Sequence, residues 1–289
     1  MHSDDWHWHL TEDIDEFLAR AGEFLRSRPV PHLMQLTWTA RLRARGAAAY
    51  DAEGAVFGLL ERAGEVHATF YRLSPRRGLG LSPLTAEQAD ALAARLVELG
   101  HSVPSVSADD GTAAVFAEAW QRHAGARETP RVRVRLCLRR LGTLVPPEPL
   151  PAGRGRAVGE RDHEQLMDLC RGFAADVGEA VTIDADTWAD TRFADKNYTF
   201  WETPDGTPVS LAGANPMIAG LVQVDPVYTP APLRGRGYAG AVTAEVSRAA
   251  LAAGATDVVL FTDAANPTSN ALYRRLGYVP AVDWVVYDF

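Results

Sequence analysis

One stretch decides the fold: Val227-Tyr-Thr-Pro-Ala-Pro-Leu-Arg-Gly-Arg-Gly-Tyr-Ala239. An apolar strand pattern ends here, a proline-containing loop follows, and a glycine-rich turn opens a long helix pattern. The first N–H groups of a helix lack intrahelical acceptors and the helix dipole attracts negative charge, so such a turn is typical of phosphate binding. We therefore expect the amides of Gly235 to Ala239 to hold a phosphate, with charge added by Arg234 and Arg236.

The same stretch also matches the dinucleotide pattern G-x-G-x-x-G, with Asp263 at the end of the next predicted strand. In a dinucleotide fold the strand leads almost directly into the first glycine, whereas the segment Thr229 to Arg234 intervenes here. Too few residues follow Gly240 to complete a doubly wound sheet, and predicted strands precede the motif instead of a chain start. These features oppose a nicotinamide or flavin dinucleotide site.

A second helix has a clear start and end. Asn266 is a good N-cap, and Pro267 occupies the first helical position, where its missing N–H costs no hydrogen bond. Leu272 and Leu276 lie one turn apart and are expected to face the core. Gly277 is expected to end the helix with a left-handed cap.

The surrounding sequence predicts an α/β fold with a mixed sheet. An Asp-Gly pair at Asp205 lies between two strand patterns and predicts a tight hairpin. The expected helices cover residues 162–175, 184–194 and 238–253, and the expected strands cover a short segment ending at Val158 and residues 197–202, 208–214, 218–229, 256–262 and 282–289.

The N-terminal half repeats this order of elements without a recognisable repeat of residues. Its expected helices cover residues 11–26, a segment from Thr85 with Gln88 in capping-box spacing, and 112–125; its expected strands cover 55–61, 65–71, a segment near Val103, and 131–138. A Pro/Gly-rich stretch from Val145 to Gly155 is typical of a linker. We therefore expect two domains, residues 1–152 and 153–289, that are duplicated copies of one fold.

These motifs resemble the GCN5-related N-acetyltransferases, the GNAT superfamily. The family signature, Gln/Arg-x-x-Gly-x-Gly/Ala at a helix start, is matched by Arg234, Gly237 and Ala239. A second block, Asn266-Pro-Thr-Ser-Asn-Ala-Leu-Tyr-Arg-Arg-Leu-Gly-Tyr278, resembles the family's coenzyme-contacting helix. The resemblance implies the acyl-CoA N-acyltransferase fold for the second half. For the first half the resemblance is only one of architecture: it is similar to the degenerate first domain of the family's tandem members.

The resemblance also implies how acetyl-CoA is held. The central sheet is expected to splay after the strand that ends at Thr229, with pantetheine in the gap, and Pro226 fits the bulge that the family has at this place. Asn270 would contact the pantetheine arm, whereas Asn266 ranks lower because it caps the helix. The implied coenzyme-binding residues are Val227, Tyr228, Thr229, Arg234, Gly235, Arg236, Gly237, Tyr238, Ala239, Asn266, Asn270 and Tyr273.

Tyr273 carries the implied acid chemistry. It follows Asn270 by about one turn on the same helix face, and the resemblance implies that it protonates the departing thiolate. The alternative is a core aromatic beside Leu272. A sensor that binds the coenzyme without turnover would not need this acid.

A base must also accept the proton of the attacking amine. No histidine follows His163, so a histidine base would have to be His163 or come from the first domain. A carboxylate acting through water would serve equally well. The candidates near the expected cleft are Glu202, Asp225 and Tyr228.

Composition excludes several classes of protein. The net charge of −8 argues against nucleic-acid binding, and no apolar run approaches the length of a membrane span. The first residues lack a signal-peptide pattern, so we expect a cytoplasmic protein. Cys137 and Cys170 form no metal-type pair and are expected to be buried and reduced. The cluster of His2, His7 and His9 could bind a metal, but we favour an exposed surface and expect no metal.

The charge of the second half suggests the acceptor. Between Asp162 and Asp205 there are 11 acidic residues against three basic ones, Arg171, Arg192 and Lys196. We therefore hypothesise a cationic amine acceptor, with ordinary helix surface as the alternative explanation.

The expected activity is transfer of an acetyl group from acetyl-CoA to a primary amine of a small molecule or peptide, by a monomer or homodimer. The alternatives are a non-catalytic acyl-CoA sensor or scaffold and a mycothiol-synthase-like tandem acetyltransferase. In the first half, Arg77 to Ser82 begins like the phosphate motif, but Pro83 delays the helix. That half also lacks counterparts of Asn270 and Tyr273 near residues 119–125, so one acetyl-CoA is expected per chain.

Overall fold

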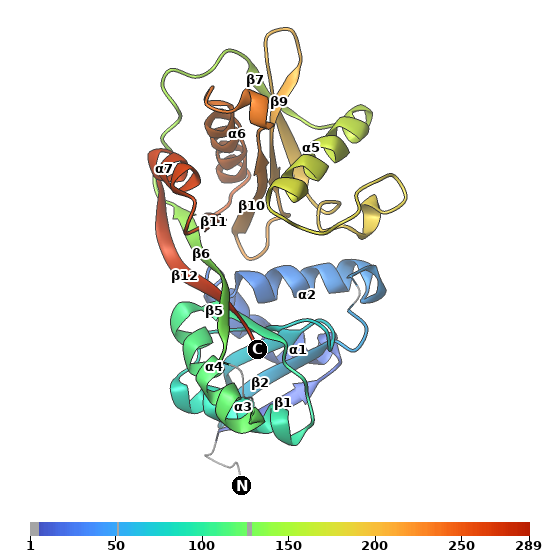
Figure 1. Cartoon of the computed structure of the whole chain (residues 1–289), viewed down its shortest axis with the longest axis vertical. Coiled ribbons are helices and arrows are strands. Elements are labelled where there is room, and N and C mark those ends of the chain that lie inside the picture. The colour runs from blue at the N-terminus through green and yellow to red at the C-terminus, as the bar shows by residue number, and fades with distance from the viewer. Residues whose placement is uncertain (1–5, 51, 126–128) are drawn as a thin grey trace. The chain divides into compact units, whose positions relative to one another are not determined.

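The structure is a computed structural model that describes residues 6–50, 52–125 and 129–289 (Figure 1). The chain divides into two compact units: unit 1 comprises residues 1–137 and 282–289, and unit 2 comprises residues 138–281. The division therefore falls between residues 137 and 138, before the Pro/Gly-rich stretch, whereas the sequence predicted it near residue 152. The reason is visible in the backbone, because Gly142 N donates to Gly277 O and Val145 N donates to Leu276 O, both at 3.0 Å. The stretch is therefore bound to unit 2.

Unit 1 contains a sheet with the strand order β1-β2-β3-β4-β5-β12. Its elements are β1 (His7–Thr11), α1 (Ile14–Ser27), α2 (Leu33–Arg45), the 3-10 helix η1 (Ala48–Tyr50), β2 (Val56–Arg62), β3 (Glu65–Arg72), β4 (Leu79–Leu81), α3 (Ala86–Glu98), β5 (Ser105–Asp109), α4 (Asp110–Ala124) and the first part of β6 (Arg131–Leu141). One core joins α3 and α4 to the sheet through residues such as Leu92 and Phe116. Helix α1 packs against β2, where Phe17 stacks on Phe57 with ring centroids 5.0 Å apart.

Unit 2 contains the strand order β6-β11-β10-β9-β8-β7. Its further elements are β7 (Arg154–Ala157), η2 (Glu160–Asp162), α5 (His163–Asp176), η3 (Trp188–Asp190), β8 (Asn197–Glu202), β9 (Pro208–Ala214), β10 (Leu221–Tyr228), η4 (Ala231–Leu233), α6 (Tyr238–Ala252), β11 (Asp257–Asp263), α7 (Pro267–Arg275) and the start of β12 (Tyr278–Asp288). Strand β12 begins in unit 2 and ends in unit 1, and β6 does the reverse.

Two apolar layers cover the sheet of unit 2. Helices α6 and α7 share one core with Val222 of β10 and Val258 of β11. Helix α5 shares the other core with Phe200 of β8 and Leu211 of β9 (Figure 1). Neighbouring residues of a strand point to opposite faces of the sheet. Strands β8 and β9 therefore contribute to both cores, with Phe200 and Leu211 in one and Trp201 and Ala212 in the other. The mixed α/β fold predicted from the sequence is confirmed.

The helix expected over residues 184–194 is wrong. This segment forms turns and the short η3, because Asp184 Oδ1 accepts hydrogen bonds from the backbone N–H groups of Asp186 and Thr187. An Asp side chain that bonds nearby N–H groups competes with helix formation. Strands β1 and β4 and helix α2 were not predicted from the sequence, and the last strand, expected from Val282, starts at Tyr278.

Candidate functional site

The sheet of unit 2 splays open at one edge of β10. Strands β10 and β11 run parallel and are paired only where Leu221 to Gln223 face Asp257 to Val259. Beyond this point β10 continues to Tyr228 and β11 to Asp263 without pairing to each other. Unpaired strand edges present backbone N–H and C=O groups that an extended ligand can bind. The gap lies at the position expected from the sequence.

A bulge interrupts β10 beside this gap. The register between β10 and β9 shifts between Val224 and Val227, and the Asp225–Pro226 peptide bond is cis. A proline cannot donate to the ladder, so it is accommodated at such an irregularity. Gly213 on β9 permits the close approach, because a Cβ there would lie 2.6 Å from the Asp225 carbonyl oxygen. The bulge expected at Pro226 is confirmed.

Helix α6 begins without a side-chain cap. Its N-cap is Gly237, which has φ +84° and makes no side-chain cap hydrogen bond. Gly235 also has a positive φ of +77°. The N–H groups of the first turn, including those of Tyr238 and Ala239, therefore point out of the helix end without intrahelical acceptors. This is the geometry that the phosphate-cradle interpretation requires.

Gly240, the third glycine of the apparent dinucleotide pattern, has a packing role. A Cβ at this position would lie 3.2 Å from Leu272 Cδ1 and 3.3 Å from Pro147 Cγ. Pro147 belongs to the Pro/Gly-rich stretch, which therefore crosses α6 beside the cradle. Contact with α7 and this stretch explains the glycine without a dinucleotide.

Arg234 does not point into the cradle, contrary to expectation. Its Nε donates to the carbonyl oxygen of Thr229 at 3.0 Å, and its guanidinium forms an ion pair with Asp176 at the end of α5. The side chain thus closes the loop between β10 and α6, and its charge is balanced. Arg236 is exposed and donates to Pro232 O at 3.3 Å, within the same loop.

Asn270 is held by its neighbours on both sides of its amide group. Its Nδ2 donates to the carbonyl oxygens of Asp263 at 3.1 Å and Ala264 at 3.2 Å. Its Oδ1 accepts from Arg139 Nη2 at 3.1 Å. Asn266 caps α7 by accepting from Ser269 N at 3.1 Å, in agreement with the capping role. Arg139 could not be linked to Asn270 from the sequence, because the two residues are 131 positions apart.

Tyr273 is the buried residue of α7, with 8% of its surface exposed. Its ring meets that of Tyr278 edge-on, with centroids 5.9 Å apart. Burial raises the pKa of Tyr273 well above its ordinary value, and the charges of Tyr278 and Asp225 act in the same direction. The hydroxyl is therefore protonated at neutral pH, as a general acid must be. The ring also belongs to the core of unit 2, as expected for a core aromatic, and the acid role of Tyr273 stays a prediction.

The two candidate carboxylates lie at different places. Asp225 adjoins the bulge, and its Oδ2 accepts from Arg192 Nη1 at 2.6 Å and from Lys196 Nζ. Glu202 lies at the other end of the β8–β9 ladder, opposite Pro208. Val224, the neighbour of Asp225, pairs with Ala214 on β9, whereas Glu202 pairs with Pro208. At roughly 3.3 Å per residue along β9, Asp225 and Glu202 are therefore about 20 Å apart. The structure does not bring these carboxylates together.

Glu202 is a structural ion-pair partner. It is buried, and its Oε1 accepts from Arg156 Nε at 2.6 Å. Arg156 also donates to Asp162 at 2.7 Å, and this contact lowers the pKa of Asp162 to about 2. Together these groups fasten β7 to β8 and to the start of α5.

Tyr228 packs against α5. Its hydroxyl would lie 2.6 Å from a Cβ at Gly172, so the glycine admits the ring. Burial raises the pKa of Tyr228, and the Asp176 carboxylate adds to this effect. A tyrosine whose pKa is raised is a poor base at neutral pH.

All three basic residues of the acidic segment are paired. Arg171 contacts Asp168, Arg192 contacts Glu179 and Asp225, and Lys196 contacts Asp225. Acidic side chains left over in this segment therefore dominate its field. Cys137 and Cys170 are free and buried, as expected, and burial raises the pKa of Cys170 to about 12.

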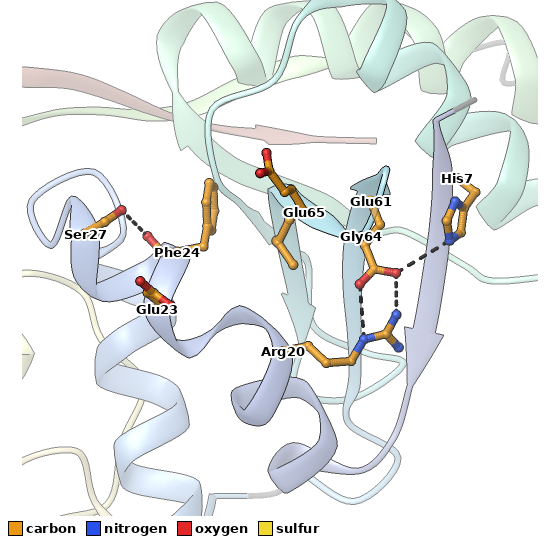
Figure 2. A pocket seen from close by; sticks show the side chains of 9 residues that line it. His7, Arg20, Glu23, Phe24, Ser27, Glu61, Gly64 and Glu65 are labelled. Atoms are coloured by element: carbon orange, nitrogen blue, oxygen red, sulfur yellow. Dashed lines mark hydrogen bonds and ion pairs between the residues drawn. The ribbon is translucent and has the colours of Figure 1, made fainter. Parts of the chain in front are cut away.

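Unit 1 has a cavity of about 810 Å³ between α1 and the β2–β3 turn (Figure 2). Glu61 lies in its wall, where Arg20 Nε donates to Oε1 at 3.1 Å and His7 Nε2 lies 3.5 Å from Oε2. His9 pairs with Glu16 at 2.9 Å, and His2 lies outside the described residues. Among the described residues, no group of three or more His, Cys, Asp or Glu side chains is arranged to hold a metal ion. Within the same ranges, no helix is long and apolar enough to cross a membrane.

Comparison with known proteins gives a consistent result. Residues 153–278 match the model of the acetyltransferase (GNAT) family. A GNAT-family acetyltransferase from Colwellia psychrerythraea is 11% identical with a TM-score of 0.61, covering 98% of this chain and 99% of that chain. A GCN5-related N-acetyltransferase from Sphaerobacter thermophilus is 20% identical with a TM-score of 0.55, covering 99% and 96%.

A tandem GNAT protein described as part of the clavulanic acid biosynthesis pathway is 12% identical with a TM-score of 0.58, covering 98% of both chains. At these identities the solved structures show the fold alone, which is that of two tandem GNAT-like domains. Comparison with curated proteins gave no match.

Proposed function

We propose that unit 2 transfers an acetyl group from acetyl-CoA to a primary amine, because residues 153–278 match the model of the acetyltransferase (GNAT) family. The single observation that carries this proposal is the gap between β10 and β11, which leads to the uncapped start of α6 at Gly237. Acetyl-CoA has two parts that suit this arrangement. Its amide-containing arm can pair with the open strand edge, and its pyrophosphate can bind at the adjacent helix start.

The coenzyme binds along this path. Amides from Gly235 to Ala239 hold the pyrophosphate, and the strand edge from Val227 to Thr229 pairs with the pantetheine arm. Asn270 borders the arm from α7. One N–H beside the bulge polarises the thioester carbonyl, where negative charge develops during the reaction.

The reaction is a direct attack in a ternary complex. The amine nitrogen forms a bond to the carbonyl carbon, the carbon–sulfur bond breaks, and the leaving thiolate takes a proton from Tyr273. The amine loses its proton through water to a carboxylate. Asp225 is the better candidate for this base, because it adjoins the bulge, whereas Glu202 is about 20 Å away along the strands.

The acceptor is a small molecule or peptide that carries a cationic amine. The support is the acidic segment from Asp162 to Asp205, in which Arg171, Arg192 and Lys196 are all paired with carboxylates. A field of one sign raises the local concentration of the oppositely charged substrate. Cationic amines should therefore be acetylated faster at low than at high ionic strength.

Calorimetric titration with acetyl-CoA tests the proposed function. The wild type should bind one equivalent per chain, and Gly237→Glu should weaken binding by about 100-fold or more, because it adds backbone strain and a negative charge in the cradle. Gly206→Glu is the matched control. Gly206 also has a positive φ, +86°, and lies in an open turn of the same unit, where a Cβ added to it would meet no atom within 4 Å.

Binding that is equal in the wild type and Gly237→Glu would show that the cradle is misassigned. Binding followed by free-thiol release with an amine would establish the enzyme, and binding without turnover on any amine would favour the sensor.

A further inference from the structure

Arg139 lies on β6, the strand that begins in unit 1 and ends in unit 2. Its Nη2 donates to Asn270 Oδ1 at 3.1 Å, and its Nε donates to Thr262 Oγ1 at 3.2 Å. Thr262 is buried near the end of β11, and Asn270 lies on α7. One guanidinium therefore ties together two elements that border the gap.

We propose that Arg139 is a positioning residue of the coenzyme site, which fixes the amide group of Asn270 against the end of β11. This inference rests on the proposed function of unit 2 and extends it to β6, which neither sequence motif includes. Arg139 lies in the part of β6 that belongs to unit 2, as do Thr262 and Asn270, so the whole contact is made within that unit.

The two hydrogen bonds explain why an arginine is suited to this position. A guanidinium presents N–H donors in a rigid fork, so it can hold two acceptors at once with fixed geometry. Because Asn270 Oδ1 accepts from Arg139, the Nδ2 end must face the carbonyl oxygens of Asp263 and Ala264, as it does. The amide can take only one orientation in this arrangement.

A fixed amide favours ligand binding. Ordering a side chain on binding costs free energy, and a group that is already ordered avoids this cost. Without Arg139, Asn270 Oδ1 loses its charged donor, and the amide is held only by the Nδ2 hydrogen bonds to Asp263 O and Ala264 O. The effect should fall on the pantetheine arm and not on the nucleotide, which is held at the start of α6.

Two ligands separate these halves in a calorimetric experiment. CoA contains the pantetheine arm, and adenosine 3′,5′-bisphosphate does not. Arg139→Ala should weaken CoA binding by about 10-fold and leave adenosine 3′,5′-bisphosphate binding unchanged within about twofold. Arg140→Ala should change neither ligand, because Arg140 is the next residue of the strand and pairs with Asp257.

A double-mutant cycle tests whether Arg139 acts through Asn270. Arg139→Ala and Asn270→Ala should each weaken CoA binding, and the double variant should bind no more weakly than the weaker single variant. Additive losses, or equal losses for both ligands, would overturn the inference. If Arg139→Ala fails to fold, Arg139→Gln, which keeps one amide donor, should show the same selective loss to a smaller degree.

The failure of the inference is distinct from that of the proposed function. A wild type that binds no CoA would refute the coenzyme site itself. A wild type that binds CoA and an Arg139→Ala variant that binds equally well would refute only the role of Arg139.

Discussion

The two units place a helix after the strand at the same point of the fold, but the two helices begin differently. In unit 1, α3 begins with a complete capping box, in which Gln88 N donates to Thr85 Oγ1 at 3.3 Å and Thr85 N donates to Gln88 Oε1 at 3.0 Å. In unit 2, α6 begins at Gly237 with no side-chain cap. The capping box satisfies two backbone donors at the start of α3, whereas no side chain caps the start of α6.

The strand before each helix differs in the same sense. Strand β4 has only three residues, and pairing to β5 covers Leu79 and Gly80. Strand β10 continues from Val224 to Tyr228 beyond its last pair with β11. A strand must extend past its pairing to leave an open edge: β10 does so from Val224 to Tyr228, whereas β4 does so only at Leu81.

The last helix of each unit carries different residues at the positions of Asn270 and Tyr273. Counted from the N-caps Asp109 and Asn266, the position of Tyr273 corresponds to Phe116. Phe116 is fully buried and has no hydroxyl. By the same count, Asn270 corresponds to Ala113, so the counterparts fall earlier in α4 than the segment 119–125 considered in the sequence.

The framework is nevertheless retained in both units. Glu61 and Glu202 each lie at a strand end directly after a register shift, and each is buried. Arginine side chains that are both 34% exposed, Arg20 and Arg156, pair with them. Glu61 and Glu202 are thus similar buried ion-pair partners, although Arg20 comes from a helix and Arg156 from a strand, and the two units differ chiefly at the residues that we propose bind the coenzyme.

Tyr273→Phe should give the largest effect on turnover. It converts the residue to the phenylalanine of unit 1, and we expect kcat to fall by about 100-fold with acetyl-CoA affinity unchanged, because only proton transfer to the thiolate is lost. Stopped-flow detection of the free thiol measures the rate, and calorimetry measures the affinity.

Tyr278→Phe is the control for this loss. Tyr278 is also buried, its ring contacts Tyr273, and its hydroxyl bonds Ser247 Oγ at 2.8 Å, so removal should cost stability and not turnover. Because the pKa of Tyr273 is raised, the wild type should show no alkaline loss of acid function below about pH 10. An unchanged kcat in Tyr273→Phe across this range would remove Tyr273 from the chemistry.

Glu61→Gln and Glu202→Gln should have similar, intermediate effects. Each variant leaves an arginine without its buried carboxylate, and we expect the free energy of unfolding to fall by about 2 kcal/mol. Urea unfolding monitored by circular dichroism gives this value. Turnover of Glu202→Gln should fall only with the folded fraction. A selective loss of kcat in fully folded Glu202→Gln would instead make Glu202 a participant in catalysis.

Local chemistry explains what the sequence could predict. The start of α7 follows from the Asn266 side chain, which bonds an N–H three residues away, and the start of α6 follows from glycines that need positive φ. The bulge at Pro226 follows from a residue that lacks an N–H. Each of these features depends on a few consecutive residues.

Long-range pairing explains what the sequence could not predict. Arg139 and Asn270 are 131 positions apart, and no periodicity connects them. The same holds for the Arg234–Asp176 ion pair, which directs Arg234 away from the cradle. The division of β6 and β12 between the units is also a property of the folded sheet and not of either segment.

Thr85→Ala should produce the smallest effect and sharpen the comparison most directly. The change removes one half of the capping box of α3, so the free energy of unfolding should fall by about 1 kcal/mol. It also frees a first-turn N–H in unit 1, at the position that corresponds to the cradle of unit 2. Calorimetry should still find one acetyl-CoA per chain, with a dissociation constant within about twofold of the wild type, because the short β4, Ala113 and Phe116 offer the coenzyme no other contacts. A second binding event in Thr85→Ala would mean that the cap alone had closed an otherwise intact site.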